Sequence, residues 1–142
     1  MKSSRGFTLI EILIALVVVA IIAAVAVPNY QRQIMKTRRA AAAVCLMELS
    51  QWMERFYTVN LRYDQDKDGK TITLPTDMQC QKDLTGFYSV GAVPGGITAR
   101  AYKLAAVPDP VKQKDELCGS LTLDQTGMKG VSTAADPTLC WK

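Results

Sequence analysis

The sequence predicts an α+β fold, in which one long amino-terminal helix packs on a small antiparallel sheet. Three features of the chain indicate this arrangement. Residues 12–27 form an unbroken run of sixteen apolar side chains. No glycine occurs between Phe7 and Asp68, and Pro28 is the one proline of that stretch, so a helix can occupy most of it. After residue 60, alternating apolar and polar residues separated by turn residues are typical of short strands.

Size and composition narrow the class of protein. The chain has 142 residues, enough for one domain, with 17 basic and 13 acidic side chains and a formal net charge of +4. This positive excess is too small to indicate a nucleic-acid-binding protein by itself. The chain contains no histidine, the side chain used most often as a general base and as a metal ligand. The composition therefore disfavours an enzyme, and we expect neither catalytic residues nor a cofactor.

The amino-terminal segment is arranged differently from an ordinary export signal. A short basic stretch ends at Gly6, and apolar residues follow at once, with Glu11 among them. A conventional signal would be cut after the apolar run, where Ala24 and Ala26 provide a small-residue site. It would then hold the Glu11 carboxylate at bilayer depth, which costs about 2.5–3.5 kcal/mol. Residues 7–27 span about 30 Å as a helix, the thickness of a bilayer core, so we favour a retained membrane span.

Residues 2–11, a basic leader ending in glycine and then Phe-Thr-Leu-Ile-Glu, resemble the processing site of type IV prepilins. The resemblance implies that a prepilin peptidase cuts after Gly6 and methylates the new terminal residue, Phe7. It also implies a protein that spans the inner membrane once, with a cytoplasmic amino terminus, and later joins other pilin subunits in a pilus. Glu11 would pair with the terminal amine of a neighbouring subunit during assembly. The alternative is a Glu11 that lies near the membrane surface and reaches water.

The expected processing divides the chain into a leader over residues 1–6, a membrane and assembly helix over 7–27, and an exported part over 28–142. In the exported part, the helix is expected to continue toward Val59 and to bury an apolar stripe at steps of three and four residues. The stripe consists of Ala42, Cys45, Leu49, Trp52 and Phe56. Basic residues just after Pro28 are interpreted as solvated or as contacts between subunits; they are Arg32, Lys36, Arg38 and Arg39.

The strand pattern predicts three or four strands, over residues 86–93, 97–107 and 117–123. Turns are expected at residues 94–96, which are Pro-Gly-Gly, and at residues 127–130, which begin and end with glycine. Short turns join antiparallel strands, so an antiparallel sheet is the simplest arrangement, with the helix stripe as its cover.

The four cysteines include no Cys-x-x-Cys pair, which favours disulfides in an oxidising compartment over a zinc site or a redox motif. Four cysteines allow three pairings. Cys118 and Cys140 flank the last pair of strands, and Cys45 lies on the buried stripe. We therefore expect Cys118 to bond Cys140 and Cys45 to bond Cys80. Each bond would stabilise the domain by about 3–4 kcal/mol in the chain-entropy model. Free buried thiols are the alternative.

The end of the chain resembles one group within the pilins. Residues 118–127 read Cys-Gly-Ser-Leu-Thr-Leu-Asp-Gln-Thr-Gly, and Cys-Trp follows at residues 140–141. With Arg-Phe-Tyr at residues 55–57 and Gly-Phe-Tyr at 86–88, they resemble the PilE and ComP group of minor pilins. The resemblance implies a structural subunit that contributes to pilus assembly, twitching, adhesion and DNA uptake. A receptor that captures DNA is the alternative within the group. A single-pass periplasmic domain with a solute-binding or enzymatic role is the alternative outside it.

Lysines that converge on one loop would support the DNA receptor, because lysines neutralise phosphates. Lys112 and Lys114 precede Cys118, and Lys129 lies in the loop closed by Cys118 and Cys140. Acidic residues alternate with these lysines, so a solvated surface of mixed charge is the favoured interpretation. The acidic residues are Asp109, Asp115, Glu116 and Asp136.

A weak calcium site is a further hypothesis. Asp64, Asp66 and Asp68, followed by Gly69, reproduce the first half of an EF-hand loop, where alternate carboxylates surround the cation. The second half does not match, because Pro75 stands where a bidentate glutamate belongs. Neighbouring lysines also lower the negative charge, so a plain polar turn is the favoured alternative.

Overall fold

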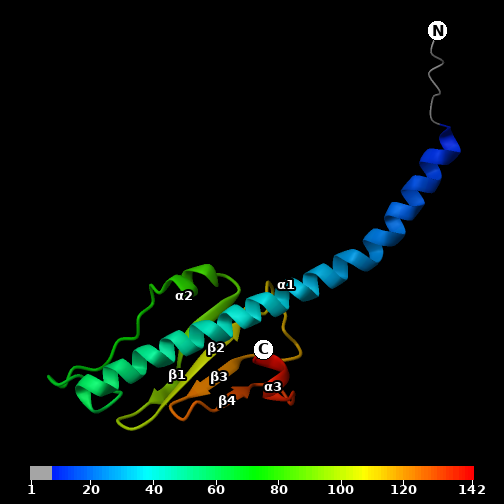
Figure 1. Ribbon diagram of the computed structural model, residues 1–142. Helices are drawn as coiled ribbons and strands as arrows, with labels where there is room; N and C mark the ends of the chain where they lie inside the picture. The colour runs from blue at the N-terminus through cyan, green and yellow to red at the C-terminus, as the bar shows by residue number, and fades with distance from the viewer. Residues whose placement is uncertain (1–7) are drawn as a thin grey trace. The chain divides into compact units, whose positions relative to one another are not determined.

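The computed structural model describes residues 8–142, so Gly6 and Phe7, the expected cleavage and methylation residues, lie outside the described part. The chain forms two compact units, divided between Ile34 and Met35. One helix, α1 (Leu9–Asn60), contributes to both units. The second unit contains the remaining elements, which are labelled in Figure 1: α2 (Gln79–Asp83), β1 (Tyr88–Ile97), β2 (Tyr102–Pro108), β3 (Leu121–Asp124), β4 (Lys129–Val131) and α3 (Pro137–Cys140).

In the first unit, the helix presents apolar side chains to its surroundings, and residues 9–27 are exposed throughout. The helix begins after Thr8, whose hydroxyl accepts a hydrogen bond from the Glu11 backbone N–H at 3.4 Å. Pro28 lies inside α1 without ending it, although proline removes one backbone hydrogen bond. Among the described residues, α1 is the one helix long and apolar enough to cross a membrane.

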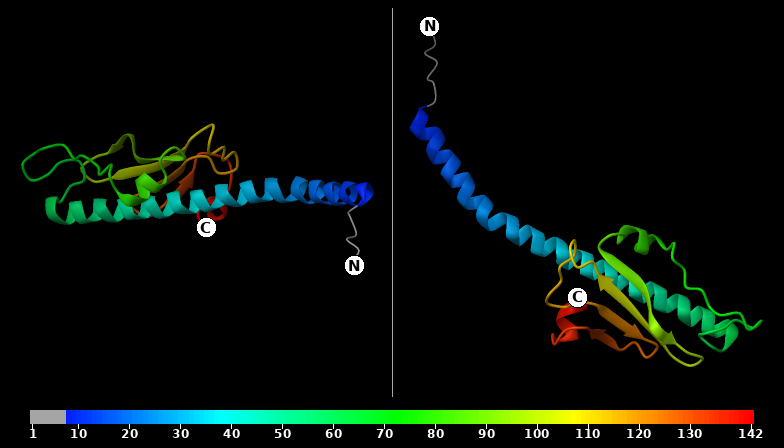
Figure 2. Two further views of the ribbon diagram at one scale, coloured as in Figure 1. Left: turned by 90° about the horizontal axis from the view of Figure 1, so that it is seen from above. Right: turned by 180° about the vertical axis from the view of Figure 1, so that it is seen from behind.

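In the second unit, α1 lies across one face of a four-stranded antiparallel sheet (Figure 1). The strand order β1-β2-β3-β4 follows the chain, so each strand pairs with the next one. The left view of Figure 2 shows this part of the helix and the sheet as two layers. The predicted α+β fold, a long helix on a small antiparallel sheet, is therefore confirmed.

The apolar core of the second unit fills the space between these two layers. Leu46, Leu49 and Met53 of α1 are fully buried, as are Leu104 and Leu121 of the sheet. Burying side chains of this size stabilises a domain by about 1.5–3 kcal/mol each. The sheet therefore depends on the helix as its cover.

The predicted helix stripe is confirmed from Ala42 to Trp52 and is wrong at Phe56. Ala42, Cys45 and Leu49 are buried, whereas Trp52 and Phe56 are half-exposed and stack on each other with ring centroids 5.7 Å apart. Met53 is fully buried in the core, and half-buried Trp52 packs against the core. Trp52, three residues after Leu49, falls short of a full helical turn from it. Met53, four residues after Leu49, lies closer to the helix face that packs on the sheet.

The ends of the strands also differ from the prediction. No turn forms at residues 94–96, because β1 continues to Ile97 through a register shift that begins at Ala92. The turn instead occupies residues 98–101, where the Thr98 backbone N–H donates to the Ala101 carbonyl at 2.8 Å. Residues 117–120 precede β3 rather than belong to it. The Pro-Gly-Gly segment thus forms a bulge within a strand, a role that glycine also permits.

Two disulfides hold segments that are distant in sequence. Cys45 of α1 is bonded to Cys80 of α2, and Cys118, before β3, is bonded to Cys140 of α3. These are the two pairs that the sequence analysis expects. The first fixes the connection between α1 and β1, and the second fixes the carboxyl-terminal helix beside the sheet.

Candidate functional site

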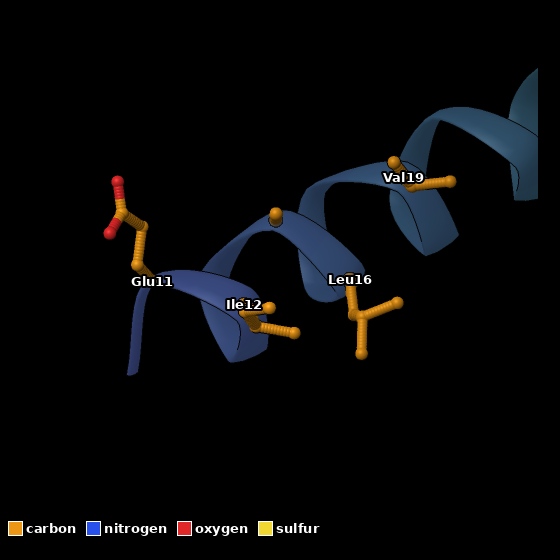
Figure 3. Close-up of a pocket in the computed structure, with 5 residues that line it drawn as sticks. Glu11, Ile12, Leu16 and Val19 are labelled. Atoms are coloured by element: carbon orange, nitrogen blue, oxygen red, sulfur yellow. The ribbon is translucent and has the colours of Figure 1, made fainter. Parts of the chain in front are cut away.

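The first candidate is Glu11, in the first turn of α1. Glu11 is one of the residues that line an open apolar surface, with Ile12, Ala15, Leu16 and Val19. Figure 3 shows the Glu11 side chain extending away from the apolar side chains of its neighbours. Among residues 8–142, no salt bridge involves Glu11. The surface can therefore pack against another apolar helix, and the carboxylate is available to a cation outside the described residues.

A buried polar network lies where the segment between β2 and β3 meets α1. Only 8% of Arg39 is exposed, and its Nη1 atom lies 2.9 Å from both carboxylate oxygens of Asp115. The same Nη1 atom lies 2.8 Å from Cys118 Sγ. The Tyr88 hydroxyl and the Cys118 backbone N–H both donate to Asp115 at 3.2 Å. Burial is the main cause that raises the pKa of Tyr88 to about 12.

The interpretation of Arg39 as solvated or as a contact between subunits is therefore wrong, because the residue is buried against Asp115 of its own chain. Arg39 and Asp115 are 76 residues apart, so periodicity along the helix gives no sign of the pair. A buried guanidinium requires a partner, and the returning loop supplies it. Arg38, its neighbour, lies instead over the ring of Phe87, with Cζ 3.6 Å from the ring centroid.

The structure does not bring the three candidate DNA-binding lysines together. Lys112 and Lys114 are exposed in the loop that follows β2, and the Lys114 Nζ atom lies 3.3 Å from Glu116. Lys129 begins β4, where it pairs with Leu123, which in turn pairs with Leu104 near the start of β2. Lys112 and Lys114 thus lie toward one end of β2, and Lys129 lies toward the other.

Lys129 instead lies beside an aromatic residue that the sequence analysis did not select. Its Nζ atom is 5.3 Å from the centre of the Trp141 ring, and Trp141 Nε1 donates to the Gly130 carbonyl at 3.1 Å. An open groove of about 500 Å³ lies here, lined by Lys129, Asp136, Pro137, Thr138 and Trp141. In the sequence, Trp141 could have been selected as a candidate because it directly follows Cys140, a cysteine expected to form a disulfide.

Within this groove, Asp136 is committed to the start of α3. Its carboxylate accepts hydrogen bonds from the Thr138 backbone N–H and hydroxyl, both at 2.8 Å. These bonds, the backbone bond first, hold the pKa of Asp136 below its usual range. The groove therefore combines one exposed lysine, one indole ring and one acidic group that already has partners.

The calcium hypothesis receives no support from the structure. The Arg62 guanidinium binds Asp64 through Nε and Nη2, at 2.7 and 3.0 Å. Asp66 Oδ1 accepts from the backbone N–H groups of Asp68 and Lys70, which closes the turn on itself. In the described part of the chain, no group of three or more Asp, Glu, Cys or His side chains gathers to hold a metal. Hydrogen bonds within the loop organise it.

An exposed apolar helix with one early carboxylate, continued into a helix-on-sheet unit with two disulfides, defines the class of type IV pilins. Two family models match the chain. "Prokaryotic N-terminal methylation motif" matches residues 1–27, and "Type IV minor pilin ComP, DNA uptake sequence receptor" matches residues 28–122. The chain belongs to the type IV minor pilin ComP family. Membership implies association with other pilins and prepilin processing.

Two solved pilin structures are similar to this chain. A type IV pilin from Shewanella oneidensis is 26% identical, with a TM-score of 0.49 over 76% of this chain and 98% of that one. The non-core minor pilin PilV of Neisseria meningitidis is 19% identical, with a TM-score of 0.50 over 73% of this chain and 93% of that one. The likeness to PilV concerns the fold and agrees with the long helix packed on a small sheet.

Proposed function

We propose that this chain is a structural minor subunit of a type IV pilus, which enters the filament through the exposed half of α1. Before assembly it spans the inner membrane once, with a cytoplasmic amino terminus, and it is cut after Gly6 and methylated at Phe7. The observation that carries this proposal is the fully exposed apolar helix over residues 9–27, with Glu11 in its first turn. The pilin family and fold indicate a structural, non-enzymatic protein.

Glu11 gives the assembly step its physical basis. A carboxylate buried among apolar helices costs about 2.5–3.5 kcal/mol unless a cation compensates it. The new amine of Phe7 in a neighbouring subunit is such a cation, and it exists only after cleavage. Pairing the two groups would therefore favour one register of helix against helix and would make assembly depend on processing.

Mass spectrometry of the exported protein tests the processing, and a Glu11→Val variant tests the assembly. We expect a mature chain that begins with methylated Phe7. We expect the Glu11→Val protein to reach the membrane at the normal level, with both disulfides formed, but to be absent from sheared pili. A mature chain that begins near Val27 would contradict the proposal, and so would normal incorporation of the Glu11→Val protein.

We also propose that the subunit captures duplex DNA at the groove beside Trp141. The family description names a DNA uptake sequence receptor, and the groove provides suitable chemistry. Lys129 can neutralise a phosphate, while the Trp141 ring offers an apolar face to a sugar of the backbone. Asp136 is held by Thr138, which limits its competition for the lysine.

Binding of duplex DNA to the purified full chain over a range of salt concentrations tests the DNA proposal. We expect affinity to fall as salt rises, and Lys129→Ala to weaken binding and reduce the salt slope by about one. Lys67→Ala is the matched control, because Lys67 is an exposed lysine of the turn that contains Asp66 and Asp68. Binding that does not respond to salt, or that both substitutions weaken equally, would argue against this groove.

A further inference from the structure

A small groove lies between the carboxyl-terminal part of α1 and the segment that follows this helix. Figure 1 shows the segment, in green, between α1 and α2. The groove, which we call the aromatic groove, is lined by two residues of α1 and by residues of that segment, among them Trp52, Phe56, Asp66, Lys70, Thr71 and Thr73. All of them belong to the second unit. The aromatic groove shares no lining residue with the groove beside Trp141.

Two aromatic rings provide the apolar part of the aromatic groove. The rings of Trp52 and Phe56 stack with centroids 5.7 Å apart and planes inclined by 21°. Trp52 packs against the core, whereas Phe56 packs on Trp52, and both side chains remain half-exposed. Phe56 therefore adds aromatic surface to the groove rather than to the core. A flat apolar surface of this kind suits a ligand that has one apolar face.

Hydrogen bonds fix the polar part of the aromatic groove. The Asp66 backbone N–H donates to the Lys70 carbonyl at 2.9 Å. Asp66 Oδ1 accepts from the backbone N–H groups of Asp68 and Lys70, at 3.0 and 2.9 Å. Neither of these two bonds uses Oδ2, the second acceptor of the carboxylate. Asp66 can therefore accept a hydrogen bond from a ligand while the turn stays closed.

The charges around the aromatic groove balance. Residues 62–70 include three cations and three carboxylates, and one of each lines the groove, as Lys70 and Asp66. Thr71 and Thr73 are exposed and add hydroxyl groups, which both donate and accept. The groove therefore favours a neutral ligand that carries hydroxyl groups.

The size of the aromatic groove limits the ligand to a single ring. Its volume is about 160 Å³, whereas clefts that enclose drug-sized ligands have about 300–1,000 Å³. A pyranose sugar combines the required features, because its ring hydrogens form an apolar face and its rim carries hydroxyl groups.

We infer that the aromatic groove binds the terminal sugar ring of a neutral glycan. The ring stacks on Trp52 and Phe56, and Asp66 Oδ2 accepts from its hydroxyl groups, while the rest of the glycan extends into solvent. The inference goes beyond the assembly and DNA proposals and depends on neither, because neither Glu11 nor Trp141 lines this groove.

Tryptophan fluorescence of the full chain in phosphatidylcholine nanodiscs tests the inference. The chain has two tryptophans, so Trp141→Phe leaves Trp52 as the reporter. We expect millimolar methyl β-galactoside or methyl β-glucoside to shift its emission to shorter wavelengths in a saturable way, because the sugar displaces water from the indole. A disaccharide that ends in the same hexose should bind with similar affinity. No saturable response to both glycosides, or failure of the disaccharide to bind, would overturn the inference.

Three substitutions locate the binding within the aromatic groove. Phe56→Leu should weaken binding about tenfold, because it keeps an apolar side chain but removes the flat ring. Phe87→Leu is the matched control and should leave binding unchanged, since Phe87 is also half-exposed and lies outside the groove. Asp66→Asn should weaken binding about tenfold as well, because the amide keeps Oδ1 for the turn but replaces the second acceptor with a donor.

Two further measurements test the neutral character and the place of the ligand. Glucuronate should bind no more tightly than methyl β-glucoside, and tighter binding would show a site for anions at Lys70 instead. In a Trp52→Phe variant, Trp141 is the reporter and should not respond to the glycosides. A response of Trp141 without one of Trp52, or equal effects of the two Phe→Leu substitutions, would also overturn the inference.

Discussion

At the scale of single residues, Arg39 links α1 to the segment that leads into β3. Its salt bridge to Asp115 is almost fully buried, and the same guanidinium reaches Cys118 Sγ. The ion pair therefore helps to hold this segment on the helix, together with the hydrogen bond from Gln113 Nε2 to the Met35 carbonyl. Buried pairs of this kind contribute little net stability relative to apolar residues, but losing one partner is costly because the other charge stays buried.

The Asp115→Asn substitution should reveal this dependence. It leaves the Arg39 guanidinium buried without a carboxylate, and we expect the free energy of unfolding to fall by about 3–5 kcal/mol. Denaturant unfolding of the full chain in detergent measures the change. Glu116→Gln is the control, because the Lys114–Glu116 pair is exposed, and we expect it to change stability little. Similar effects of the two substitutions would show that the buried pair has no special role.

At the scale of elements, the two disulfides fix different parts of the second unit. Cys45–Cys80 ties α2 to α1, whereas Cys118–Cys140 ties α3 to the segment before β3. Trp141 directly follows Cys140, and its indole is hydrogen-bonded to β4 at Gly130. The second disulfide therefore holds the indole beside Lys129, and the first has no part in that groove.

Removing each disulfide by paired Cys→Ser substitutions should separate stability from DNA binding. The sequence separations of 35 and 22 residues are similar, so we expect each loss to destabilise the protein by about 3–4 kcal/mol. Loss of Cys118–Cys140 should also weaken DNA binding, because α3 and Trp141 are released. Thermal unfolding and salt-dependent DNA binding of the same preparations measure both effects. Equal DNA affinity of the two variants would argue against the groove beside Trp141.

At the scale of the whole molecule, buried tyrosines make the stability of the second unit depend on pH in the alkaline range. Tyr63, Tyr88 and Tyr102 are buried in the core between α1 and the sheet; Tyr88 begins β1 and Tyr102 begins β2. Burial is the main cause that raises the pKa of each from 10.0 to about 12. Tyr63 and Tyr102 also donate to Glu54, whose negative charge opposes ionisation of both phenols.

We expect the unfolding temperature to be independent of these tyrosines below pH 10 and to fall between pH 10 and about 12. In that range the unfolded chain has already lost phenolic protons that the folded chain keeps. Thermal unfolding across the range, with ultraviolet absorbance of phenolate as the second measurement, checks the prediction. A Tyr102→Phe variant should show a weaker dependence on pH, and an unchanged dependence would contradict the assignment.

Elements whose signal is local were predictable from the sequence. The apolar run, the absence of glycine from Phe7 to Asp68 and the alternation after residue 60 predicted the helix and the sheet, because periodicity depends on neighbouring residues alone. The two cysteine pairs also match. The turn at residues 94–96 was wrong because glycine permits a bulge within a strand as well as a turn.

Covalent order and residue type were enough to predict the long helix, the small sheet and the early position of Glu11 in an apolar segment. They did not predict that Arg39 is buried against Asp115 or that Lys129 lies beside Trp141 rather than with Lys112. These contacts join residues that are far apart in sequence. Pairings of that kind arise when the loops fold back onto the helix and sheet, and no local periodicity records them.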